Sequence, residues 1–200
     1  MSQPPDDAHL RELAIAGEQV YCGSFLQVRR DRVQLPDGKT ATREYIQHPG
    51  AVMIVPLLPD GRLLLERQYR YPMQRVMLEF PAGKLDPQET PLACAQRELL
   101  EETGYSASEW AHAGVLHNAI AYSDEGIEIF FARGLVAGTR RLDEGEFLDL
   151  VTHSEAELDE LSRRGELTDA KTLIGLLWLS RWRSGQWPLD WCPAGAAPRD

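Results

Sequence analysis

The sequence predicts an α/β protein that combines mixed strands with helices and begins with a small antiparallel β unit. The continuous apolar run from Ala51 to Leu58 is typical of a buried strand. Thr90-Pro91 pairs a hydroxyl N-cap with a proline at the first helical position, and Ser154-Glu155-Ala156-Glu157 forms a capping box. Leu35-Pro36-Asp37-Gly38-Lys39 is a strong turn signal between two extended stretches.

The N-terminal third is expected to lie outside the main domain. Residues Met1 to Leu10 are polar and proline-containing, so we expect them to be disordered. Two extended stretches from Val20 to Tyr45 then form the antiparallel unit, and His48-Pro49-Gly50 interrupts the chain. The expected organisation is a tail and small β unit over residues 1–48, a main domain over 49–184 and an irregular tail over 185–200.

In the main domain, a turn at Pro59-Asp60-Gly61 follows the first buried strand. Further strands are expected at Arg62 to Tyr69, Val76 to Phe80, Gly126 to Arg133 and Phe147 to Thr152. The helix that begins at the capping box is expected to end near Gly165. Helical spacing predicts a last core helix with its apolar stripe at Ala170, Leu173, Ile174, Leu177 and Trp178.

The helix between Pro91 and the stop signal at Gly104 has one apolar face and one acidic face. Its apolar stripe is Leu92, Ala95, Leu99 and Thr103. Glu98, Glu101 and Glu102 fall on another face, where three carboxylates repel one another unless a cation neutralises them. Oxygen ligands suit a hard cation such as Mg²⁺ or Mn²⁺. Arg97 lies one position off that face and is expected to pair with Glu101 and orient it.

Composition limits the class of partner and the compartment. The chain has 200 residues, enough for one globular domain with an appendage, and 43% of them are hydrophobic. Its net charge of −10, from 21 Lys and Arg against 31 Asp and Glu, argues against nucleic acid as the partner. No apolar run is long enough to span a membrane, so no membrane partner is expected. Cys22, Cys94 and Cys192 lack metal-ligand spacing, which favours reduced thiols and a cytoplasmic location.

The segment from Gly83 to Tyr105 resembles the Nudix box, G-x5-E-x7-R-E-U-x-E-E-x-G-U, where U is a bulky apolar residue. All the fixed positions match, and Tyr105 at the final U is the one soft departure. The resemblance implies an α/β/α sandwich with a mixed sheet and metal-dependent hydrolysis of a pyrophosphate bond. Metal ions bridging the diphosphate would stabilise the developing charge and lower the pKa of a bound water.

The likeness extends over roughly residues 23–181 and is similar to the ADP-ribose pyrophosphatase branch of that family. The segments that carry it are Arg43-Glu44, His48 to Val52, Glu66 to Arg70 and Leu78 to Gly83. By this resemblance, the carbonyl of Ala82 is a metal ligand beside Glu98 and Glu102. Arg43, Glu44 and Arg70 are expected to face the substrate, with Arg70 near phosphate.

Asp143-Glu144-Gly145-Glu146-Phe147 is similar to a late acidic loop of the same branch. The resemblance implies that Glu144 is the catalytic base and Glu146 a further metal ligand. Without it, a solvated acidic turn explains the segment equally well. Gly145 adds mobility, as expected for a loop that closes over substrate. Glu144 is preferred to Glu101 as the base because pairing with Arg97 would hold Glu101 in place.

Two departures from the branch leave the substrate open. Ala119-Ile120-Ala121-Tyr122 replaces a Ser-Pro-Gly turn, and Phe25 alone remains of paired aromatics that would stack on adenine. The first expectation is cleavage of ADP-ribose to AMP and ribose 5-phosphate. The alternatives are a sugar-nucleotide or dinucleotide pyrophosphatase and a non-catalytic nucleotide-binding sensor. Because a two-stranded unit is marginally stable alone, the stretches from Val20 to Tyr45 are expected to pack in a homodimer.

Overall fold

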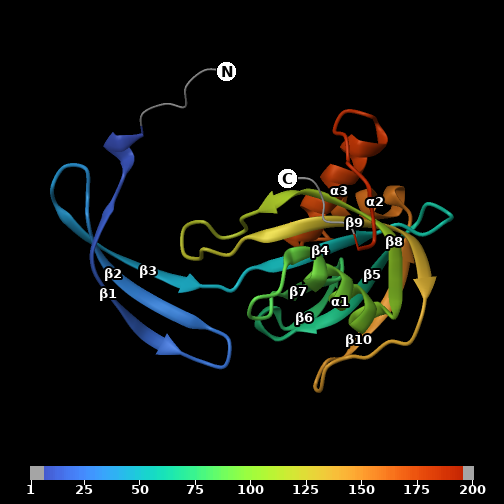
Figure 1. Ribbon diagram of the computed structural model, residues 1–200, viewed down its shortest axis with the longest axis horizontal. Helices are drawn as coiled ribbons and strands as arrows, with labels where there is room; N and C mark the ends of the chain where they lie inside the picture. The colour runs from blue at the N-terminus through green and yellow to red at the C-terminus, as the bar shows by residue number, and fades with distance from the viewer. Residues whose placement is uncertain (1–6, 196–200) are drawn as a thin grey trace. The chain divides into compact units, whose positions relative to one another are not determined.

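Two units, each with its own internal contacts, make up the part of the chain that the structure describes. The structure is a computed structural model, and it describes residues 7–195 (Figure 1). The first unit holds the described residues up to His48 together with the segment Ala119–Glu125. The second unit holds Pro49–Asn118 and the residues from Gly126 onward.

The first unit is a three-stranded antiparallel sheet with the order β1-β2-β3. Its strands are β1 (Leu13–Cys22), β2 (Gln27–Gln34) and β3 (Thr40–Gln47). The predicted turn closes β2 onto β3, and the Leu35 amide donates to the Lys39 carbonyl at 2.8 Å. The two predicted stretches are β2 and β3, and the additional strand β1, which pairs with β2 along its length, was not expected. Its apolar residues stand in two runs, Leu13–Ala16 and Val20–Cys22, and do not alternate with polar ones, so strand periodicity did not identify it.

The expectation of disorder from Met1 to Leu10 was wrong for Ala8–Leu10. Ala8–Leu10 forms the short 3₁₀ helix η1, while residues 1–6 lie outside the described part. The segment Ala119–Glu125 joins the first unit through backbone hydrogen bonds to β3. The Ile46 amide donates to the Tyr122 carbonyl at 2.8 Å, and the Asp124 amide donates to the Ile46 carbonyl at 3.2 Å.

The second unit contains a five-stranded mixed sheet, a three-stranded sheet and three α-helices. The five-stranded sheet has the order β11-β8-β9-β4-β7, in which β4 and β9 run parallel, and the other has the order β10-β5-β6. The strands are β4 (Ala51–Pro56), β5 (Leu63–Arg70), β6 (Arg75–Glu79), β7 (Ala82–Lys84), β8 (Tyr105–Leu116), β9 (Ile127–Ala137), β10 (Leu148–His153) and β11 (Cys192–Pro193). The 3₁₀ helix η2 (Tyr71–Met73) joins β5 to β6.

Three of these strands were not expected from the sequence. β7 is three residues long, and β8 follows the box helix directly after Gly104, without a turn cluster to mark it. β11 lies in the tail that was expected to be irregular, and it pairs Cys192 with Trp110 of β8. The five other main-domain strands occur where the sequence predicted them, within a few residues at each end.

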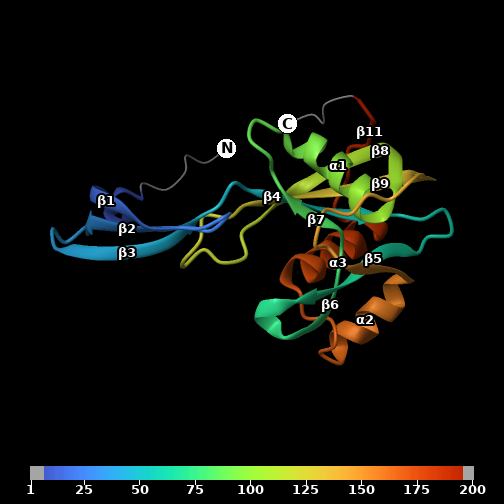
Figure 2. The same ribbon diagram turned by 90° about the horizontal axis from the view of Figure 1, so that it is seen from below.

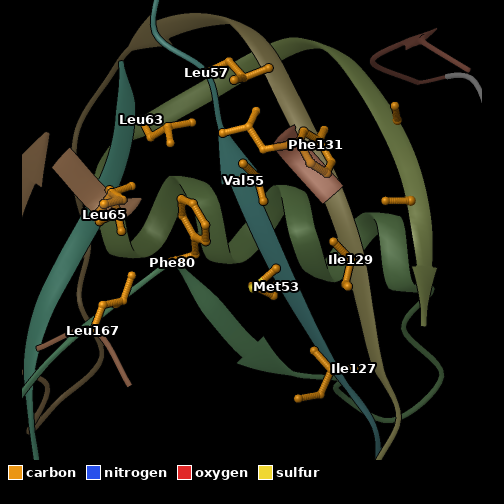
Figure 3. Packing of buried hydrophobic residues seen from close by; sticks show 14 of the residues in the cluster. Met53, Val55, Leu57, Leu63, Leu65, Phe80, Ile127, Ile129, Phe131 and Leu167 are labelled. Atoms are coloured by element: carbon orange, nitrogen blue, oxygen red, sulfur yellow. The ribbon is translucent and has the colours of Figure 1, made fainter. Parts of the chain in front are cut away.

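The core lies on both faces of β4, whose six residues are all buried. Met53 and Val55 point into one hydrophobic cluster, with side chains from β5, β9, α2 and α3 (Figure 3). Val52 and Ile54 point into a second cluster, with Cys94 and other residues of α1. The five-stranded sheet therefore has α1 on one side and α3 with the smaller sheet on the other (Figure 2). This confirms the expected sandwich with a mixed sheet.

Two helices form as their end signals predicted. α1 (Pro91–Thr103) begins where the Thr90 hydroxyl accepts the Ala93 amide and ends at Gly104, whose φ is 75°. α2 (Glu155–Arg163) carries the complete capping box between Ser154 and Glu157. None of the helices in residues 7–195 is long and apolar enough to cross a membrane.

α3 (Ala170–Arg183) forms as predicted, and Ile174 and Trp178 of the predicted stripe pack against the core, but its most buried residues lie beside that stripe. Thr172, Gly175 and Leu179 are buried, whereas Leu173 and Leu177 of the predicted stripe are 36% and 42% exposed. The helix is apolar on most of its circumference, so spacing alone does not select one face. Close packing does, because a Cβ at Gly175 would lie 2.9 Å from the Met53 side chain.

Candidate active site

An acidic cleft of about 290 Å³ opens in the second unit beside the box helix. It is formed by β5, β7, α1 and the loop before β10. Its lining residues are Gln68, Arg70, Ala82, Gly83, Lys84, Asp86, Arg97, Glu98, Glu101, Glu102, Asp143 and Glu146. A larger hollow of about 830 Å³ lies between α2, α3 and the turn at Asp60–Arg62, away from the box residues. We place the candidate site in the smaller cleft because the clustered carboxylates meet there.

Arg97 holds three acidic residues of the box together. Its guanidinium contacts both carboxylate oxygens of Glu89 at 2.9 and 2.8 Å. Its Nη1 donates to Glu98 Oε1 at 2.8 Å and to Glu101 Oε2 at 3.1 Å. Hydrogen bonds from Arg97 lower the pKa of Glu89 to about 2. The predicted pair with Glu101 is present, and the arginine also orients Glu98, which the sequence did not indicate.

Glycine at position 83 lets β7 lie against the acidic face of α1. A Cβ built on Gly83 would stand 1.8 Å from Glu98 Oε1, closer than any side chain tolerates. The neighbouring Ala82 amide donates to Glu102 Oε2 at 3.1 Å. The first fixed position of the box therefore provides the space in which Glu98 extends along the strand.

Glu98 and Glu102 are both desolvated, and their pKa values reflect it. Burial raises the pKa of Glu98. Burial, followed by the charges of Glu66, Glu98 and Glu146, raises the pKa of Glu102 to about 10. Carboxylates held this close, with little water, are stabilised in their charged form by a bound cation.

The donor set fits a hard divalent cation, although the residues are not arranged as a closed ligand shell. Within residues 7–195, no three Asp, Glu, His or Cys side chains stand together as ligands. Glu98 Oε1 is held by Arg97, and Glu102 Oε2 is held by the Ala82 amide. The desolvated carboxylates that meet in this cleft match the oxygen chemistry that Mg²⁺ and Mn²⁺ prefer.

A second charged network lies at the base of the cleft, and the sequence reasoning missed most of it. Arg70 forms a two-pronged ion pair with the buried Glu79, with N–O distances of 2.7 and 2.9 Å. Lys171 of α3 also pairs with Glu79 and reaches Asp169 at 3.0 Å. Burial acts to raise the pKa of Glu79, but Arg70 and Lys171 outweigh it and lower that pKa. Arg70 therefore lines the cleft with its guanidinium already oriented.

Glu66 lies beside this network and is fully buried in β5. Burial and then the charge of Glu79 raise the pKa of Glu66 to about 7. The signal for it in the sequence is an acidic residue directly after three leucines of a strand, Leu63 to Leu65. An acidic residue at the end of a buried strand run also fits an exposed strand end, so the sequence alone does not indicate that Glu66 is buried.

The acidic loop before β10 reaches the cleft with two of its residues. Asp143 and Glu146 line the cleft, whereas Glu144 is exposed and does not. The loop is anchored at the end of α1, because the Arg141 amide donates to the Glu101 carbonyl at 3.0 Å. Gly145 follows with a φ of 89°, a conformation that glycine adopts without strain. The turn is thus held at its base, with Glu144 at its exposed tip.

Three predicted substrate residues lie in the first unit. Arg43 pairs with Glu12, with an Nε–Oε2 distance of 2.9 Å, and Glu44 accepts from Arg30 at 2.8 Å. Phe25 is 51% exposed. The cleft described above is lined entirely by residues of the second unit, so a substrate role for these three side chains stays a prediction.

Comparison with known proteins follows the same division of the chain. The NUDIX domain matches residues 47–174, and the nucleoside diphosphate sugar hydrolase N-terminal domain matches residues 15–46. The chain belongs to the Nudix family. It is a Nudix hydrolase whose box helix is α1. Of the fixed residues of the box, Arg97 contacts Glu89, Glu98 and Glu101, and Gly83 lies against Glu98.

Relatives of this Nudix hydrolase cover most of its length. ADP-ribose pyrophosphatase of Bacillus subtilis (strain 168) is 35% identical over 172 residues, covering 85% of this chain and 93% of the relative. The methanol dehydrogenase activator of Bacillus methanolicus is 34% identical, covering 84% and 92%. A crystal structure of an ADP compounds hydrolase superposes with a TM-score of 0.78 at 27% identity, covering 88% of this chain and 97% of that one.

Proposed function

We propose that this Nudix hydrolase cleaves the pyrophosphate bond of ADP-ribose, giving AMP and ribose 5-phosphate, with Mg²⁺ as its cofactor. The observation that carries the proposal is the cleft in which Arg97 orients Glu98 and Glu101 beside the buried Glu102. The match to a nucleoside diphosphate sugar hydrolase N-terminal domain and the Bacillus subtilis relative support this class of substrate.

We assign the cation to Glu98, Glu102, the Ala82 carbonyl and Glu146, and Mn²⁺ is expected to substitute for Mg²⁺. When bound, the cation would neutralise charge on the diphosphate and acidify a water. Desolvation of Glu98 and Glu102 supports the assignment, because burial makes each of them costly to ionise alone. Glu146 contributes charge to the same cluster from the loop.

Glu144 is assigned as the base that accepts the proton of the attacking water. Its rival Glu101 is held at 3.1 Å by Arg97, and Arg97 is itself fixed by Glu89. Glu144 is exposed at the tip of a turn whose neighbours line the cleft. Loop closure on substrate would carry its carboxylate within hydrogen-bond reach of the water.

Arg70 is assigned to the substrate phosphates because it lines the cleft and Glu79 fixes its guanidinium. Arg43, Glu44 and Phe25 are assigned to the nucleoside.

A homodimer is proposed on separate grounds. Among the described residues of the first unit's sheet, Val33 alone is buried, and several large apolar side chains of β1 are exposed: Leu13, Ile15, Val20 and Tyr21. The three free cysteines support a cytoplasmic location.

A hydrolysis screen tests this function. Purified protein with Mg²⁺ is offered ADP-ribose, sugar nucleotides, NADH and dinucleoside polyphosphates, and the products are separated by chromatography. The proposal expects the highest kcat/KM for ADP-ribose, with AMP and ribose 5-phosphate released. A clear preference for another compound would move the assignment to a sugar-nucleotide or dinucleotide pyrophosphatase. Binding without turnover of any compound would favour the sensor.

A further inference from the structure

The Glu66 carboxyl is buried without a hydrogen-bond partner. Its exposed fraction is 0%, and within residues 7–195 neither carboxylate oxygen has a partner. The strand that carries it enters from the core, because Leu63, Leu64 and Leu65 before it are buried. A buried carboxyl that lacks partners is strongly disfavoured unless another group compensates it.

The two nearby cationic side chains are engaged by another carboxylate. Glu79 of β6 stands directly across from Glu66 in the β5–β6 pairing. Arg70 spans both oxygens of Glu79, and Lys171 pairs with Glu79 and Asp169. Negative groups therefore outnumber positive ones around Glu66, so its ionised form is stabilised only by a further positive charge, which a bound divalent cation can supply.

Strand alternation places Glu66 on the face of β5 that forms the cleft. Residues two apart in a strand share one face, so Glu66, Gln68 and Arg70 point the same way. Gln68 and Arg70 line the cleft, whereas Arg67, which lies between them and Glu66, is exposed. Glu66 thus lies on the same strand face as two residues that line the cleft, but at a buried position.

We propose that Glu66 is an additional carboxylate of the divalent cation site, at its inner end, where its free oxygens help to hold the ion bound by Glu98 and Glu102. The inference rests on the proposed cation dependence of this cleft. In this role, Glu66 strengthens cation binding and contacts no substrate.

Binding of Mn²⁺ to the full chain, followed by the electron paramagnetic resonance signal of free Mn²⁺, tests this without substrate. Glu66→Gln keeps the size of the side chain and removes its charge, so the Kd for Mn²⁺ should rise roughly tenfold to a hundredfold. The melting temperature of the metal-free protein should hold or rise, and the stabilisation by Mn²⁺ should shrink. Glu66→Met, an apolar replacement suited to the leucine surroundings, should weaken Mn²⁺ binding equally and serves if the glutamine variant does not fold.

Asp149→Asn is the matched control, because Asp149 lies on the adjacent strand β10 with its side chain 79% exposed. It should leave Mn²⁺ affinity within twofold of the wild type. If Glu66→Gln lowers the melting temperature of the metal-free protein and leaves Mn²⁺ affinity unchanged, while Glu98→Gln weakens it, then Glu66 is structural and the inference is wrong. If Glu98→Gln and Glu102→Gln also leave Mn²⁺ affinity unchanged, the proposed cation site itself fails.

Discussion

Replacing Arg97 by lysine tests whether the hydrogen bonds of this arginine hold Glu89, Glu98 and Glu101 in place and stabilise the fold. Lysine keeps one positive charge but loses the planar fork that spans both oxygens of Glu89 and reaches Glu98 and Glu101. The variant should therefore be less stable than the wild type, and Glu98 and Glu101 should lose their fixed orientation.

The magnitude follows from the pKa of Glu89. Arg97 is the main cause that lowers this pKa from 4.5 to about 2. Each tenfold change in an acid constant corresponds to about 1.4 kcal/mol, which gives an upper limit of roughly 3 kcal/mol. The side chains of Arg97 and Glu89 are 29% and 14% exposed, so solvent screening reduces this to about 1–2 kcal/mol. For a chain of this size, the melting temperature should fall by about 2–8 °C.

The assay is calorimetric unfolding at several pH values without added metal. Because the pKa of Glu89 is depressed in the folded state, its stabilising contribution is fully present above pH 4.5 and is lost as the pH falls towards 2. The difference between Arg97→Lys and the wild type should therefore shrink in acid. Arg163→Lys is the control, since Arg163 also spans two oxygens of one carboxylate, Glu160, but on the exposed surface. Arg163→Lys should have the melting temperature of the wild type. If Arg97→Lys also has the melting temperature of the wild type at pH 7.5, the hydrogen bonds of Arg97 do not stabilise the fold as argued.

Three further outcomes are expected. Gly83→Ala should fold but lose most activity, because the new methyl group would collide with the Glu98 carboxylate; activity near that of the wild type would contradict the close packing. Glu144→Gln should depress kcat strongly and leave KM nearly unchanged. If Glu144→Gln turns over normally while Glu101→Gln is inactive, Glu101 is the base. Sedimentation at micromolar concentration should show a dimer. A species that is monomeric throughout would contradict the proposed homodimer.

The parts of this fold that depend on local signals could be predicted from the sequence. The ends of α1 and α2 were correct because a hydroxyl cap, a proline or a capping box acts within a few residues. The buried strand β4 was correct because its apolar run has no polar interruption. The face of α3 was only partly correct: Ile174 and Trp178 pack against the core, but the most buried position is set by how closely Met53 approaches Gly175, a contact between distant segments.

The same distinction applies to the site. The spacing of the box placed Arg97 within reach of Glu101, since both lie on one helix. Pairing of Glu79 with both Arg70 and Lys171 joins strands β5 and β6 to α3, and no spacing in the sequence indicates it. The buried position of Glu66 likewise depends on sheet register. The sequence therefore revealed the box helix, Arg70 and the acidic loop that line the cleft, but not the pairing of Glu79 with Lys171 or the burial of Glu66.

Hydrolysis of ADP-ribose by Glu98→Gln at limiting Mg²⁺ tests the central claim most directly. Glutamine preserves the size of the side chain, so folding should persist, as circular dichroism can verify. The account predicts that turnover falls by orders of magnitude and that added Mg²⁺ restores only part of it. Near-normal release of AMP and ribose 5-phosphate by this variant at limiting Mg²⁺ would contradict the assignment of the cation to this cleft.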